Sequence, residues 1–130
     1  MSSRRCLCDF IILTTIPHLL TLYYSINDVF YTIILLAATF SSILWHKSHE
    51  TSLKLLYIDY SCAVVLALYE IYKSKNKVEI VYINLGLFTL NKSMDVLSKY
   101  RILKYSKSHC IYHIMSCYKT FYIARNAYSS

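Results

Sequence analysis

The chain has very little of the two residues that most often build tight turns, with one glycine and one proline in 130 residues. This scarcity argues against folds made of many short strands and reverse turns, and it favours long helices. Charged residues are also scarce, at 16% against about a quarter in ordinary soluble domains. Since 56% of the residues are hydrophobic, we expect an all-α protein embedded in a membrane, folded as a single domain over residues 1–130.

The basic and cysteine residues exclude two other classes. The net charge of +7 does not indicate nucleic-acid binding, because the basic residues fall in short clusters between apolar runs and form no continuous face. Such clusters are typical of the ends of membrane segments. Five cysteines, an odd number, do not form a disulfide framework. Cys6 and Cys8 lie beside two arginines and could carry palmitate, although two unmodified thiols are the simpler interpretation.

Five apolar segments predict a polytopic bundle of about five transmembrane helices. They cover residues 10–26, 29–46, 53–72, 78–90 and 109–124. About 20 apolar residues cross a bilayer, and the second and third segments reach this length most clearly. The stretch 91–107 mixes apolar residues with lysines, which predicts an amphipathic helix at the membrane surface. Over five crossings, Lys and Arg are more frequent on the side of the N-terminus, so we expect that terminus to be cytoplasmic.

Five polar side chains inside these segments mark a candidate site, because such residues are costly in a membrane and are often functional. Ser42 and His46 are four residues apart and share a helix face, as do His109 and His113. Asp59 lies about two turns into the third segment. When the helices alternate in direction, all five side chains reach the same side of the membrane.

The histidines have the donor set of a catalytic zinc site. His46, His109 and His113 supply three nitrogens and leave the fourth tetrahedral position to water. Zinc lowers the pKa of such a water to about 7. We expect Asp59 to act as general base for this water, and Ser42 to hold the water, Asp59 or a substrate carbonyl.

The remaining ionisable residues have simpler explanations. His18, which follows the proline and has no partner in the sequence, is interpreted as structural. Glu70 and Glu79 flank a lysine cluster, so we expect them to be solvated charges at helix edges. Lys119 is expected to extend towards the far interface.

The ordered motifs Ser42-x-x-x-His46, Asp59 and His109-x-x-x-His113 resemble the CREST superfamily of membrane proteins. This superfamily includes the alkaline ceramidases and the progestin and adipoQ receptors. The resemblance implies a membrane helix bundle, zinc bound by the three histidines, and hydrolysis of a lipid amide such as ceramide. Members typically have seven helices, so the resemblance here is to a shortened form.

The leading hypothesis is a zinc-dependent membrane hydrolase of the CREST type that acts on a membrane lipid amide or ester by zinc-hydroxide attack. One alternative is a non-catalytic membrane protein with a structural zinc site, acting through partners or on membranes. Another is a bis-histidine haem protein that pairs His46 with His109 or His113, although the neighbouring Asp59 and Ser42 favour zinc. A homo-oligomer that replaces the missing helices is left open.

Overall fold

The computed structural model describes residues 11–102 and 104–128, and this part of the chain contains helices and no strand. The first helical segment, Ile11–Ser25, includes a 3-10 stretch, η1 (Ile16–Thr21), and a short helix, α2 (Leu22–Ser25). The four longer helices are α3 (Val29–Lys47), α4 (Leu53–Lys73), α5 (Lys77–Lys99) and α6 (Tyr105–Tyr128). The predicted all-α class is confirmed.

Each predicted segment forms a helix, and α3 and α4 agree with the prediction to within one residue at each end. The last two helices are longer than predicted. α5 runs to Lys99, so residues 91–99 continue this helix and do not form the separate surface helix that was predicted. Lysine is a good helix former, so the polar composition of this stretch did not end the helix.

Short polar side chains start three of the helices. Asp28, Ser52 and Asn76 each accept a hydrogen bond from the backbone N–H three residues further along, at the beginnings of α3, α4 and α5. These side chains satisfy N–H groups that have no partner inside the helix. Pro17 lies in the first turn of η1, where the missing N–H costs little. The chain therefore makes short connections without glycine turns.

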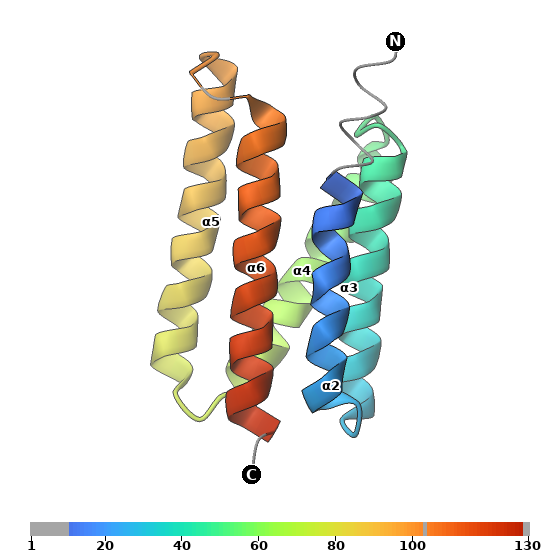
Figure 1. Ribbon diagram of the computed structural model, residues 1–130, viewed down its shortest axis with the longest axis vertical. Helices are drawn as coiled ribbons and strands as arrows, with labels where there is room; N and C mark the ends of the chain where they lie inside the picture. Colours follow the sequence, from blue (N-terminus) through green and yellow to red (C-terminus); the bar gives the residue numbers. More distant parts are fainter. Residues whose placement is uncertain (1–10, 103, 129–130) are drawn as a thin grey trace.

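The helices are arranged so that the end of α3 and the beginnings of α4 and α6 share one end of the bundle. α5 and α6 run side by side as an antiparallel pair, the first segment runs along α3, and α4 crosses behind them (Figure 1). η1 also packs against α6, which brings the two halves together.

The interior is polar and the exterior is apolar. Among the described residues, buried polar or charged side chains outnumber buried hydrophobic ones. One small apolar cluster joins α3, α4 and α6, and it consists of Tyr31, Leu35, Leu66 and Ala124. Large apolar side chains point outwards instead, such as Tyr23 (83% exposed), Phe30 (72%) and Leu68 (61%). A soluble domain shows the opposite distribution.

Within the described residues, α3 and α4 are the two helices long and apolar enough to cross a membrane, judged by length and composition. Their apolar windows are only 33% and 11% buried, respectively. The helix Ile11–Ser25 is apolar but shorter. The structure thus supports two candidate spans, fewer than the five crossings predicted.

Candidate metal centre

Three histidines from two helices converge at the end of the bundle. His46 lies in the last turn of α3 and is fully buried, while His109 and His113 lie one turn apart on α6. Nε2 of His46 lies 3.1 Å from Nε2 of His113 and 3.3 Å from Nε2 of His109. The predicted proximity of these three residues is confirmed, and together they form a group that could hold a metal ion.

The spacing of the nitrogens matches tetrahedral coordination. Zn–N bonds of about 2.0–2.1 Å at tetrahedral angles place two nitrogens about 3.3 Å apart. The two distances from His46 are close to this value, and all three donor atoms lie within 4.8 Å of one another. Hydrogen bonding explains the cluster less well, because one ring nitrogen carries either a single hydrogen or a single lone pair. His46 Nε2 nevertheless faces two neighbours at once.

A carboxylate that the sequence interpretation missed orients His46. Glu50 Oε1 lies 2.8 Å from His46 Nδ1, and its side chain is 21% exposed. An ionised carboxylate only accepts, so Nδ1 is the donor of this contact, and in the neutral ring with this tautomer the lone pair of Nε2 points into the cluster. The contact depends on the turn after α3, in which His49 and Glu50 have φ values of 56° and 59°. This left-handed backbone is unfavourable for residues other than glycine.

Two of the three histidines line an open cavity of about 540 Å³. His109 and His113 line it together with Asp59 and Ser42, whereas His46 is not among its lining residues. Asp59 accepts a hydrogen bond from Ser41 Oγ at 3.3 Å. Ser42 Oγ is buried and has no hydrogen-bond partner in the described part of the chain. The structure therefore brings all five predicted side chains to one region, with Ser41 as an additional partner of Asp59.

Glu70 and Lys119 correct two expectations. Glu70 is not a solvated edge charge and Lys119 does not extend to the far interface, because Glu70 is 0% and Lys119 is 8% exposed. Lys119 Nζ donates to Glu70 Oε2, and it also donates to Asn84 Oδ1 at 3.1 Å. Tyr31 Oη donates to the other Glu70 oxygen at 3.4 Å. The two charges satisfy each other inside the bundle, where an unpaired charge would be very costly.

A second polar cluster closes the opposite end of the bundle around Asp28. Lys73 Nζ lies 2.7 Å from its carboxylate, and Tyr128 Oη and Tyr69 Oη donate to it at 2.8 and 3.0 Å. Desolvation raises the pKa of Asp28, but the hydrogen bonds from Lys73, the Tyr31 N–H, Tyr128 and Tyr69 outweigh it and hold the pKa well below its usual range. Asp28 is thus held as a carboxylate that ties α3 to α4 and α6.

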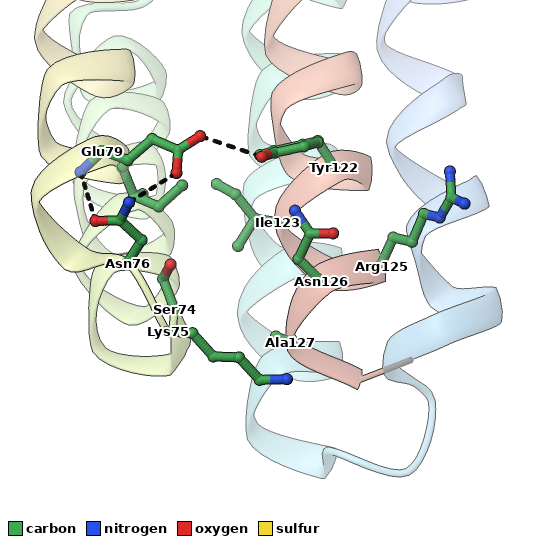
Figure 2. Close-up of a pocket in the computed structure, with 10 residues that line it drawn as sticks. Ser74, Lys75, Asn76, Glu79, Tyr122, Ile123, Arg125, Asn126 and Ala127 are labelled. Carbon is green, nitrogen blue, oxygen red and sulfur yellow. Dashed lines mark hydrogen bonds between the residues drawn. The ribbon is translucent and has the colours of Figure 1, made fainter. Parts of the chain in front are cut away.

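A separate pocket of about 420 Å³ lies at this opposite end, between the α4–α5 turn and the end of α6. Figure 2 shows Glu79 and Tyr122 facing each other across it, joined by a hydrogen bond of 3.1 Å. Glu79 also pairs with Asn76 at the start of α5. None of the histidines lines this pocket, so it is distinct from the candidate metal centre.

No family model, no curated protein and no solved structure matches the chain.

Proposed function

We propose that the protein is a zinc-dependent membrane hydrolase of the CREST type that acts on a lipid amide or ester. One observation carries the proposal: the nitrogens of His109 and His113 lie at tetrahedral spacing from that of His46, beside a cavity that Asp59 also lines. Similarity to the superfamily, on the motifs quoted above, adds the reaction class.

The donor set favours zinc among the common metals. Three neutral imidazoles without a thiolate and with an open position are the arrangement of many catalytic zinc sites. The Glu50 carboxylate behind His46 matches the carboxylate–histidine–zinc arrangement in which an outer carboxylate fixes the ring. A zinc ion bound here would activate water and polarise a carbonyl group.

The protein's own side chains supply the remaining chemistry. Asp59, on the cavity wall and held by Ser41, is the group to take a proton from the attacking water and to return it to the leaving group. The Ser42 hydroxyl, buried and without a partner among the described residues, is available to donate a hydrogen bond to a substrate carbonyl. His46, His109 and His113 hold the metal.

The surface supports placement in a membrane. The apolar windows of α3 and α4 are mostly exposed, whereas the core helix of a soluble protein buries its apolar residues. We propose that the chain is an integral, multi-pass membrane protein with a cytoplasmic N-terminus. Its substrate would then enter from the bilayer, which suits the apolar walls of the cavity.

The test combines metal content with lipid turnover on detergent-purified protein. We expect about one zinc per chain by mass spectrometry, and none in the His109→Ala/His113→Ala variant. Asp59→Asn should keep its zinc while hydrolysis of ceramide and related lipid amides falls by about 10²–10⁴-fold, the usual contribution of a general base. Asp95→Asn is the matched control, because Asp95 lines the same cavity but pairs with Lys92.

Two outcomes would contradict the proposal in different ways. If both wild type and Asp59→Asn bind zinc, and their lipid turnover is equal or absent, the zinc site is structural. This is the non-catalytic alternative. Absence of zinc from the wild type would leave the histidines as packing residues.

A haem is disfavoured by the geometry, because its axial ligands bind opposite faces of a planar ring and here three nitrogens meet at one point.

A further inference from the structure

We propose that the cavity contains a second polar site, centred on Lys119 and neutralised by the buried Glu70 behind it, that binds a neutral oxygen on the acyl chain of the substrate. This inference rests on the proposed function only in calling the ligand a substrate. The binding site itself does not require a metal. The ligand class is a single-chain acyl lipid that carries a hydroxyl or carbonyl group at mid-chain.

The cavity is continuous along one face of α6. Its lining includes His109, Tyr112, His113, Ser116 and Lys119, each of which lies three or four residues from another member of the set, as on one helix face. At 1.5 Å per residue, Lys119 lies about 9 Å beyond His113 and about 15 Å beyond His109 along the axis. A carbonyl group at the histidines therefore places the middle of its chain beside Lys119.

The wall between the two ends is apolar, as an acyl chain requires. α4 and α5 supply it, through Ala63, Val64, Leu66, Ala67, Leu85 and Phe88. The volume of about 540 Å³ falls within the range of about 300–1,000 Å³ that is typical of small-molecule sites.

Polar groups return at the far end, on three different elements. Lys119 of α6, Asn84 of α5 and His18 of η1 all line the cavity there. His18 is only 8% exposed, and its Nδ1 has no hydrogen-bond partner in the described part of the chain. Lys119 has three hydrogens and donates to two acceptors, Glu70 and Asn84, so one remains for a ligand.

The charges select a neutral ligand. Glu70 cancels the charge of Lys119, so a carboxylate or phosphate placed here would face Glu70 without a counter-charge. A hydroxyl or carbonyl oxygen accepts the remaining Lys119 hydrogen without this penalty. A clamp between α4 and α6 alone would not need Lys119 on the wall of a cavity, and an apolar pair would often serve as well.

The test uses Trp45, the single tryptophan of the chain, which lines the cavity. A brominated stearic acid methyl ester quenches its fluorescence in nanodiscs, and two unlabelled methyl esters displace this probe: plain stearate, and stearate with a mid-chain hydroxyl. The measurement is made with EDTA present. We expect the hydroxylated ester to displace the probe at least about five-fold more effectively, as one net hydrogen bond allows.

The Glu70→Gln/Lys119→Met double variant removes both charges at similar volume and leaves neither one unpaired. The two esters should displace the probe from this variant equally, and the affinity for plain stearate should be unchanged. Because the readout is a ratio within each variant, a loss of stability does not imitate this result. The inference would be overturned if the two esters displaced the probe equally from the wild type. It would also be overturned if the hydroxylated ester kept its advantage in the double variant. A hydroxyl preference here, together with no zinc in the wild type purified without chelator, would reject the hydrolase and leave this site standing.

Discussion

Replacing Glu50 by Gln tests the metal centre through a residue that would not touch the metal. Glu50 accepts from His46 Nδ1 at 2.8 Å, and its side chain is only 21% exposed, so solvent screens this charge-assisted hydrogen bond only in part. Losing such an outer carboxylate usually weakens metal binding about 10–100-fold, which corresponds to about 1.4–2.7 kcal/mol. Glutamine has the same size as glutamate, so the substitution does not add bulk at the position of positive φ in this turn.

Zinc affinity would be measured by competition with a chromophoric chelator at fixed pH. The matched control is Glu79→Gln, the same substitution at a carboxylate that is hydrogen-bonded at the start of α5, outside the histidine cluster. We expect a weaker zinc affinity for Glu50→Gln alone, and no measurable binding for His113→Ala.

The reasoning would be refuted by wild-type zinc affinity in Glu50→Gln when His113→Ala has lost binding. The histidines would then hold the metal without help from the carboxylate. An equal loss in Glu79→Gln would show instead that the effect is a general change in charge.

Three further predictions concern stability, each measured by thermal unfolding in detergent. Because the pKa of Asp28 is held low in the folded state, its contribution to stability is present above its unfolded pKa of about 4 and is lost as the pH falls through the folded value. The Asp28→Asn variant should therefore be less stable at neutral pH and show a flatter acid limb; an unchanged limb would contradict this. Lys119→Met alone should lower the free energy of unfolding by about 3–5 kcal/mol, because it leaves Glu70 uncompensated. The Glu70→Gln/Lys119→Met double variant should recover most of this loss. Leu35→Ala, at a site that is 0% exposed, should cost about 2.7–5 kcal/mol through the cavity it leaves, and a cost under 1 kcal/mol would mean that the small apolar cluster is unimportant.

The helices could be predicted because their signals are local. Apolar runs and the capping side chains at Asp28, Ser52 and Asn76 lie within a few residues of the boundaries they set. The end of α5 differs from the prediction because residues 91–99 mix apolar residues with lysines, a composition that also suits a separate helix at a membrane surface. Helix propensity does not stop at a membrane surface, and the helix continues to Lys99.

The histidine cluster was also predictable, from spacing and the alternation of helix direction. The four-residue spacing of His109 and His113 puts them on one face, and the antiparallel order of the helices brings His46 to the same end. Glu50 was missed because its contact requires two successive residues with positive φ, His49 and Glu50. No glycine or asparagine marks that turn, so residue type alone does not indicate it.

The sequence does contain a signal for the buried position of Glu70. Asp59 and Glu70 are eleven residues apart, which is three helical turns, so both face the same side of α4. An argument that places Asp59 in the interior therefore places Glu70 there too, and the buried position confirms it. A buried carboxylate then requires a cation, and on α6 Lys119 follows the histidines along the same face. The spacing that identifies the histidine site thus extends to the ion pair, whose Lys119 lines the same cavity as His109 and His113.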